Sequence, residues 1–233
     1  MLETCPSSSQ GGPTVLEKPE KQQDPTRERI LEAALDLFGE RGLNGATVRD
    51  IAARAKVNVA AISYHFGGKE ELYRAVAETV IGAIASRVRS RVGTLLAAPP
   101  REPEAALAAL EELFATFVDV IVGPEEMRRV ARFVIREQMQ PTAAFEVLFA
   151  MLSEFHGLAT RIFATATGGD AEAESTKLRV FMIFGQVLVF RIAEPAVLRR
   201  LKRDRYDAAL LDQLKADIRR NVRALVAAAR EAG

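Results

Sequence analysis

Two short helical segments separated by a tight turn are the feature that most restricts the fold of this chain. Thr47 and Asp50 have the spacing of a capping box, in which each side chain bonds the other residue's backbone N–H, and this predicts a helix over Val48 to Ala55. Asn58 is a favourable N-cap for a second helix, over roughly Val59 to His65. Two helices joined by a turn of three or four residues form a helix-turn-helix.

Further helices are predicted on both sides of this unit. Upstream, Asp24-Pro25 is an N-cap followed by proline at the first helical position, and the helix that starts there is expected to end at a Gly42 C-cap. Its apolar residues recur at helical spacing and form one stripe: Ile30, Ala34, Leu37 and Phe38. Downstream, Gly67-Gly68 interrupts the chain before a long fourth helix that begins at Lys69.

Composition agrees with an all-α protein. The 233 residues are rich in helix formers, contain no Trp, and show no alternating pattern typical of a strand. Lys and Arg number 32 against 31 Asp and Glu, so the net charge of +1 favours neither nucleic acid nor membrane as a partner, and any such partner must meet a local patch. Because the chain has one cysteine and two histidines, we expect no internal disulfide, no metal site and no cofactor; the single Cys5 fits a reducing cytoplasm.

The chain divides by composition into three parts. Residues 1–25 are rich in proline and polar residues and lack the basic start and apolar run of a signal peptide, so a disordered tail is predicted. Residues 26–74 are the predicted helix-turn-helix domain, and residues 75–233 a larger helical domain. The most apolar stretch, 180–190, is about half the ~20 residues that a membrane span needs, so no membrane partner is expected.

Helix stops in the larger domain come from its glycines and prolines. The predicted helices lie near 104–122, 125–139, 141–166, 171–193 and 207–230. The basic run 199–205 follows a predicted stop at Glu194-Pro195, and we interpret it as a solvated connection in preference to a nucleic-acid patch.

The helix after the turn has a length and composition that suit a DNA major groove. A recognition helix needs only about two turns, because the groove admits little more than its N-terminal end. The predicted buried positions are Val57, Ile62 and Phe66. Val59, Ala60 and Ala61 are small, so the helix can approach base edges closely, and their methyl groups can contact a thymine methyl.

Phosphate contacts are expected beside these residues. Tyr64 and His65 end the helix with hydrogen-bonding tips that suit phosphate oxygens, and Lys69 adds a cation at the start of the next helix. A lone histidine is more often a structural residue, but the position of His65 between Tyr64 and Phe66 favours a functional role.

Residues 29–76 carry a specific resemblance. They read "RILEAALDLFGERGLNGATVRDIAARAKVNVAAISYHFGGKEELYRAV" and resemble the N-terminal DNA-binding domain of TetR-family transcriptional regulators, with "YHF" and "KEEL" among the matching elements. A more local stretch at 132–149, "RFVIREQMQPTAAFEVLF", resembles the C-terminal domain of the CecR-like subgroup. One departure is Lys56, where the family usually has glycine; if the turn needs a positive φ, lysine there costs about 1 kcal/mol.

The resemblance implies an all-α homodimer that binds a palindromic operator as a repressor and is released by a small molecule. It implies that residues 26–74 are the DNA-binding domain and residues 75–233 the helical ligand-binding and dimerisation domain. It also implies which residues touch DNA. Phosphate contacts would come from Thr47, Asn58, Tyr64, His65 and Lys69, and base-edge contacts from Val59, Ala60 and Ala61; Arg49 completes the predicted DNA-binding set.

Phenylalanine is concentrated in the larger domain, and most of it is expected to form the core. A few aromatic residues of a helical bundle can instead line a pocket for an apolar or aromatic effector, with polar groups that orient it. The predicted candidates are Phe114, Phe117, Phe133 and Phe149, with Gln138, His156 and Gln186 as polar groups. Apolar stripes on the last two helices predict a dimer interface: Phe181, Phe184, Leu188, Leu210, Leu214, Ile218 and Leu225.

Two classes of function remain open at this stage. One is a ligand-responsive DNA-binding regulator; the other is a helical enzyme or adaptor in which the helix-turn-helix is only scaffold. The sequence contains no nucleophile elbow, Walker loop, dinucleotide fingerprint or HExxH motif, so the regulator is favoured.

Overall fold

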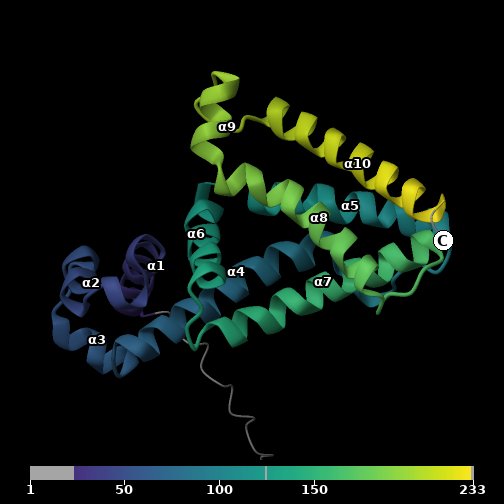
Figure 1. Cartoon of the computed structure of the whole chain (residues 1–233). Helices are drawn as coiled ribbons and strands as arrows, with labels where there is room; N and C mark the ends of the chain where they lie inside the picture. Colours follow the sequence, from purple (N-terminus) through teal and green to yellow (C-terminus); the bar gives the residue numbers. More distant parts are fainter. Residues whose placement is uncertain (1–23, 124, 232–233) are drawn as a thin grey trace, which may run out of the picture.

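The computed structural model describes residues 24–123 and 125–231, and all regular secondary structure within them is α-helical (Figure 1). The prediction of an all-α protein is confirmed. The helices are α1 (Pro25–Gly45), α2 (Val48–Ala55), α3 (Val59–Phe66), α4 (Lys69–Ala97), α5 (Pro103–Ile121), α6 (Glu125–Met139), α7 (Phe145–Thr167), α8 (Glu174–Ile192), α9 (Glu194–Leu201) and α10 (Ala208–Glu231). The predicted disordered tail falls almost entirely on residues 1–23, outside the described part; residue 25 already begins α1.

The first three helices form a small unit at one end of the molecule (Figure 1). The predicted stripe of α1, at Ile30, Ala34 and Phe38, is fully buried, and it packs with Ile51 of α2 and Ile62 of α3. Gly42 has the positive φ expected of a helix C-cap, 74°, but the chain resumes helical geometry after it, so α1 is kinked there and runs on to residue 45.

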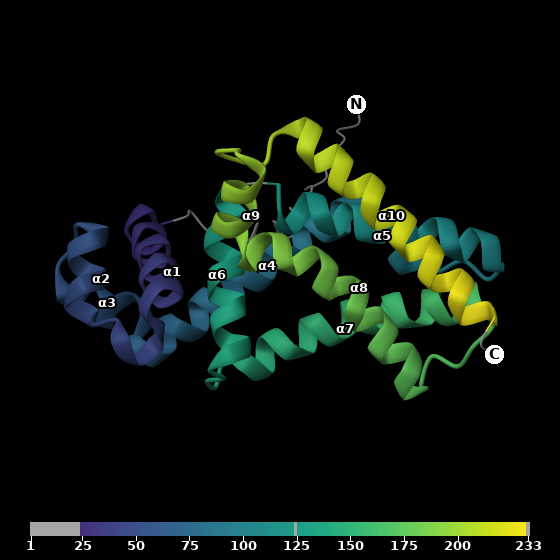
Figure 2. The ribbon, with the colours of Figure 1, turned by 45° about the horizontal axis from the view of Figure 1, so that its top comes forward.

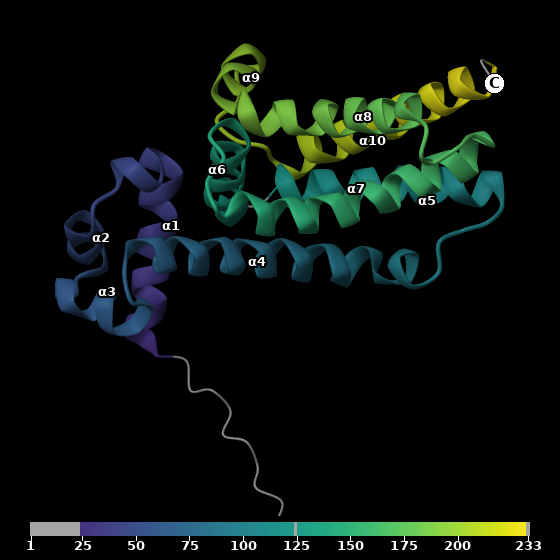
Figure 3. The same ribbon diagram turned by 60° about the horizontal axis from the view of Figure 1, so that its bottom comes forward.

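Helix α4 joins this unit to the rest of the chain (Figure 3). It is 29 residues long, begins at the end of the helix-turn-helix and runs along the bundle formed by α5, α7, α8 and α10. The boundary expected at residue 74 therefore lies inside a continuous helix. Helix α6 stands across the near end of the bundle and packs against α1, so the small unit contacts the bundle through both α4 and α6.

Helix α5 is the central element of the bundle, since it packs against α4, α7, α8 and α10. Its Leu110, Leu113 and Phe114 are completely buried. Helix α7 also contributes to the core, through its buried Ile162 and Phe163. Its length and composition would allow it to cross a membrane, but core helices of water-soluble proteins often have the same length and composition.

The predicted helix stop at Glu194-Pro195 is confirmed, since α8 ends at Ile192, but the helix that follows it was not predicted. The chain bends by 75° there, but Pro195 occupies the first turn of a new helix, α9, which includes Arg199 and Arg200. Proline suits this position because the first N–H groups of a helix have no intrahelical partner. Residues 199–205 are nevertheless exposed, as expected of a solvated segment.

Helix α10 lies along α5 and is held there by charges as well as by apolar packing (Figure 2). Arg223 forms two hydrogen bonds to Glu111, of 2.8 and 3.0 Å, and Arg219 pairs with Glu112 at 2.9 Å. Leu214 and Ile218 are buried inside the protomer.

This packing corrects the predicted dimer stripe. Leu214, Ile218 and Phe184 cannot lie at an intersubunit surface, because α5 and its neighbours already bury them. Phe181 is exposed, as the prediction requires. The exposed apolar face of α8 is a different set: Leu178, Phe181, Met182, Val189 and Ile192.

Candidate nucleic-acid interface

The turn between α2 and α3 has the geometry that the family's glycine would imply. Lys56 has φ 55° and ψ 48°, in the left-handed region, and its N–H is bonded to the carbonyls of Ala52 and Ala53. A non-glycine residue in this conformation costs about 1 kcal/mol. Helix α3 keeps its orientation because the caps on both sides form: the Thr47–Asp50 capping box, and Asn58 Oδ1 accepting from the N–H of Ala60 at 2.9 Å.

Helix α3 has one buried and one exposed face. Ile62 is completely buried, and Val57 and Phe66 are partly buried against the core. On the other side Val59 is 43% exposed and Tyr64 85% exposed, and Ala60 is also exposed. Ala61 is half-buried and packs against the core, so it lies at the edge of the exposed face and not at its centre.

Two of the residues expected to contact phosphate have partners inside the protein. The His65 side chain is only 14% exposed; its Nδ1 lies 3.5 Å from Asp24 Oδ2, beyond the N-terminal end of α1. The Lys69 Nζ donates to the carbonyl of Ala46 at 3.4 Å. The sequence pattern alone did not indicate either partner, because Asp24 and Ala46 are distant from them along the chain.

The helix caps leave other polar groups available. The Oγ1 of Thr47 accepts from the N–H of Asp50 at 3.1 Å and donates to its carboxylate at 2.8 Å, and these bonds hold the pKa of Asp50 below its usual value. The Asn58 side chain uses its oxygen as the cap, so its two amide N–H donors remain. Arg49 is exposed and makes no ion pair with the described residues.

Lys56 is a further candidate for a DNA contact, although the sequence pattern indicated only an unusual backbone φ at this position. It is exposed, it sits in the turn that leads into α3, and none of the described carboxylates pairs with it. A lysine in the turn of a helix-turn-helix was a visible signal, since a cation placed there lies beside the helix that enters the groove.

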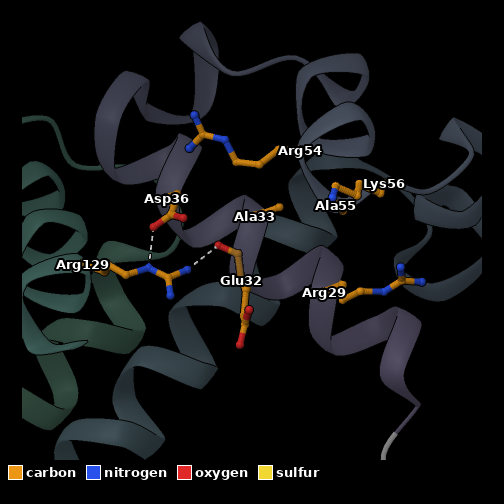
Figure 4. A pocket seen from close by; sticks show the side chains of 8 residues that line it. All are labelled: Arg29, Glu32, Ala33, Asp36, Arg54, Ala55, Lys56 and Arg129. Carbon is orange, nitrogen blue, oxygen red and sulfur yellow. Dashed lines mark hydrogen bonds and ion pairs between the residues drawn. The ribbon is translucent and has the colours of Figure 1, made fainter. Parts of the chain in front are cut away.

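Two arginines of α6 form hydrogen bonds to α1, and Figure 4 shows one of them, Arg129. Arg129 pairs with Asp36 and donates to the carbonyl of Glu32 at 2.8 Å, on the wall of a polar hollow of about 290 Å³ between α1, α2 and α6. Arg136 donates to the carbonyls of Gly39 and Glu40, at 3.1 and 2.8 Å. Helix α1 is thereby hydrogen-bonded to α6 through three of its backbone carbonyls.

A buried polar group lies behind these arginines. The carboxylate of Glu137 in α6 is completely buried, accepts from the hydroxyl of Tyr73 in α4, and also accepts from the N–H and Oγ1 of Thr142, at 3.2 and 3.0 Å. The Tyr73 ring packs between Phe38 of α1 and Phe133 of α6, with ring centroids 4.6 and 5.1 Å away. Burial is the largest cause that raises the pKa of Tyr73, and the hydrogen bond to Glu137 raises it further.

Three of the seven predicted effector residues are brought together, and the other four are not. Phe114, Phe117 and His156 belong to one aromatic cluster, in which His156 lies 3.8 Å from the ring centroid of Phe181 and its Nε2 is buried with no hydrogen-bond partner among the described residues. Burial lowers the pKa of His156. Phe133 belongs to the separate Tyr73 cluster.

The other three candidates lie outside this cluster. Phe149 is 52% exposed and stacks on Phe145, Gln138 is exposed, and Gln186 accepts from the Asn221 amide at 2.9 Å. Two hollows among the described residues, one between α1, α2 and α6 and one between α6, α8 and α9, lie elsewhere, and phenylalanine side chains pack in the bundle interior. The described residues contain no group of His, Cys, Asp or Glu that could hold a metal ion.

Comparison with known proteins agrees with this geometry. Residues 30–76 match the family of bacterial regulatory proteins of the TetR type, and residues 103–229 match the C-terminal domain of the HTH-type transcriptional dual regulator CecR. The chain is 34% identical over 177 residues to CecR of Shigella flexneri, covering 75% of this chain and 79% of that protein. It is 33% identical over 106 residues to the HTH-type transcriptional repressor NicS of Pseudomonas putida, 46% of each chain.

Solved structures share the fold. A TetR-like transcriptional regulator from Rhodococcus sp. RHA1 superposes with a TM-score of 0.59 at 18% identity, covering 85% of this chain and 96% of that one. At this identity the likeness shows the fold alone. Taken with the two family matches and the relatedness to CecR, it leads to one conclusion: the chain belongs to the TetR family of DNA-binding transcriptional regulators, with a CecR-type C-terminal domain, and is not an enzyme.

Proposed function

We propose that the protein is a cytoplasmic, homodimeric repressor that binds a palindromic operator and is released by a small molecule. The observation that carries this proposal is the exposed face of α3, where Val59, Ala60 and Tyr64 project from a helix held by the fully buried Ile62. In this proposal residues 26–74 bind DNA, and residues 75–233 bind the effector and the second subunit.

Each exposed residue of the interface has a role suited to its chemistry. Val59 and Ala60 approach base edges, where a methyl group can contact thymine. The Tyr64 hydroxyl and the Asn58 amide donate to phosphate oxygens, and Thr47 and Arg49 contact phosphate beside the start of α2. Ala61 contributes at the edge of this surface.

His65 and Lys69 differ in how they act. Lys69 remains a phosphate contact, because an ammonium has three donors and its bond to Ala46 uses one of them. His65 is mostly covered and faces Asp24, so we assign it the role of holding α3 against the start of α1.

The exposed apolar face of α8 supports the dimer. Leu178, Met182, Val189 and Ile192 follow one another at steps of four, seven and three residues, which places them on one side of the helix. A contiguous exposed apolar face marks an interaction surface. A second copy of the chain is the partner that DNA binding requires, because two heads about 34 Å apart reach successive major grooves.

The effector is proposed to be apolar or aromatic. Support comes from the aromatic cluster around Phe117 and His156, where the unpaired His156 Nε2 offers a hydrogen-bonding group. An effector bound in the bundle acts on DNA only by favouring a conformation with wrongly spaced heads.

The test is selection of DNA from a random pool by the purified protein, followed by measurement of its mass in solution. We expect a palindromic sequence and a dimer at micromolar concentration. No enrichment, or a monomer that binds a single half-site, contradicts the proposal. CecR is a dual regulator by name and NicS a repressor, so a reporter driven from the selected site, with and without the protein, decides between repression and dual control.

A further inference from the structure

A hollow of about 500 Å³ lies where α6 meets the end of α8 and α9. This volume is within the range of small-molecule sites, roughly 300 to 1,000 Å³. Ile135, Ile192 and Leu198 give it an apolar wall, and arginines of α6 give it a cationic one. It is separate from the aromatic cluster of the bundle.

One side of the hollow is rigid. Arg191 is buried, its Nε donates to the carbonyl of Ile121 at 2.8 Å, and its Nη1 pairs with Glu194 at 2.8 Å. Glu194 is itself buried and also accepts from Arg128 at 2.6 Å. Because these groups satisfy one another, they shape the wall without needing a ligand.

The other side has hydrogen-bond donors to spare. The Nε of Arg128 is buried and has no partner among the described residues. Arg132, one helical turn further along α6, has a side chain that is 46% exposed, and its one ion-pair contact within the described chain is to Glu40, at 3.8 Å. That distance is too long for a hydrogen bond. Two arginines four residues apart on a helix face the same side and can serve one acceptor.

We propose that this hollow binds a monoanionic amphiphile, with a carboxylate at Arg128 Nε and the Arg132 guanidinium and an apolar body against Ile135, Ile192 and Leu198. A neutral ligand can accept hydrogen bonds from the two arginines but lacks the opposite charge that strengthens them. A dianion is disfavoured because the carboxylates of Glu194 and Asp204 lie on the same wall. The charge and shape of the hollow therefore select a single negative charge.

Arg132 connects the hollow to the DNA-binding unit. Arg132 faces Glu40 at the end of α1, and Glu40 also pairs with Arg54 of α2 at 3.4 Å. When a ligand carboxylate binds Arg132, the ion pair between Arg132 and Glu40 is lost, and with it one of the contacts between α6 and α1. Operator affinity then falls without any contact between ligand and DNA. This step rests on the proposed function, since it requires operator binding that responds to an effector.

Calorimetric titration of the whole protein tests the site. The probes are octanoate, 1-octanol as the neutral analogue and octyl phosphate as the dianion. We expect octanoate to bind most tightly, and Arg132→Gln to weaken it by roughly 10- to 100-fold, the value of one or two hydrogen bonds to a charged group. Arg132→Lys, which keeps the charge but loses the planar fork, should lie between. Arg200→Gln, on the exposed surface of α9, removes the same charge outside the hollow and should leave the affinity unchanged.

Several results overturn the site: no octanoate binding at millimolar concentration, equal affinity of octanoate and 1-octanol, or equal affinity of the wild type and Arg132→Gln. Loss of octanoate binding in Phe117→Ala with no effect of Arg132→Gln places the ligand in the aromatic cluster and also overturns it.

Measurements of operator affinity show whether a negative result contradicts the octanoate site or the proposed function. Glu40→Gln leaves the hollow intact, so octanoate should still bind while its effect on operator affinity shrinks; an undiminished effect contradicts the coupling through Arg132. A protein that binds octanoate but selects no DNA contradicts the proposed function and not the site. A protein that binds its operator but not octanoate contradicts the site alone.

Discussion

Replacing Tyr73 by phenylalanine should destabilise the protein more than an ordinary loss of one hydroxyl. The substitution keeps the ring between Phe38 and Phe133 and removes only the bond to the completely buried carboxylate of Glu137. A hydrogen bond to a charged group contributes about 1.5–3 kcal/mol. Because Thr142 still supplies two bonds to Glu137, we expect a loss of about 2 kcal/mol in the free energy of unfolding.

The chain contains a matched control. Tyr206 donates to the backbone carbonyl of Phe190 at 2.6 Å, and its hydroxyl is partly buried. A bond to a neutral acceptor is worth about 0.5–1.5 kcal/mol, so Tyr206→Phe should cost less. Urea unfolding of both variants at one protein concentration, followed by circular dichroism, gives the two differences directly.

The test compares the loss of unfolding free energy in Tyr73→Phe with the loss in Tyr206→Phe. If Tyr73→Phe costs no more than Tyr206→Phe, or less than about 0.5 kcal/mol, then Glu137 does not depend on the Tyr73 hydroxyl, and the reasoning from its burial is refuted. If the double variant Tyr73→Phe with Glu137→Gln is more stable than Tyr73→Phe alone, the carboxylate oxygen that lost the Tyr73 hydroxyl is the cause of the loss, as expected.

Four further outcomes are expected. Ala60→Asp, which puts a carboxylate on the exposed face of α3, should abolish specific operator binding in a gel-shift assay with the melting temperature unchanged; retained binding would mean that this face does not meet DNA. Lys69→Ala should lower the slope of log affinity against log salt by roughly one, and an unchanged slope would remove Lys69 from the contacts. Met182→Arg with Val189→Arg should yield monomers in sedimentation, because both residues lie on the exposed face of α8; a dimer as tight as the wild type would place the interface elsewhere. Burial lowers the pKa of His156 in the folded protein, so below about pH 6.5 the unfolded state binds more protons than the folded state. The free energy of unfolding that the protein has above that pH is therefore lost progressively as the pH falls. His156→Gln should lose stability less steeply between pH 6.5 and 5 in urea titrations, and parallel curves would contradict this.

Local signals predicted the helix-turn-helix well. Caps at Asp24, Thr47 and Asn58 act within a few residues of the chain, so their effect can be inferred without knowing the fold, and the structure has each of their bonds. The positive φ of Lys56 was considered only as a condition, because the resembling family usually has glycine in this turn, and the structure has it. Pro195 marked the end of α8 as predicted, but it also lies in the first turn of α9, and nothing nearby in the sequence indicated that second helix.

The sequence by itself determined that the protein is helical, where the DNA-binding unit lies, and which family it resembles, because these depend on contiguous residues. Only the tertiary structure decided which apolar stripe is buried and which is left exposed. Periodicity reveals that a helix such as α10 has an apolar side, but whether Leu214 meets α5 or a second subunit depends on contacts between residues far apart in the chain. The partners of His65 and Lys69, and the hollow between α6, α8 and α9, arise in the same way: each is formed by side chains that only folding brings together.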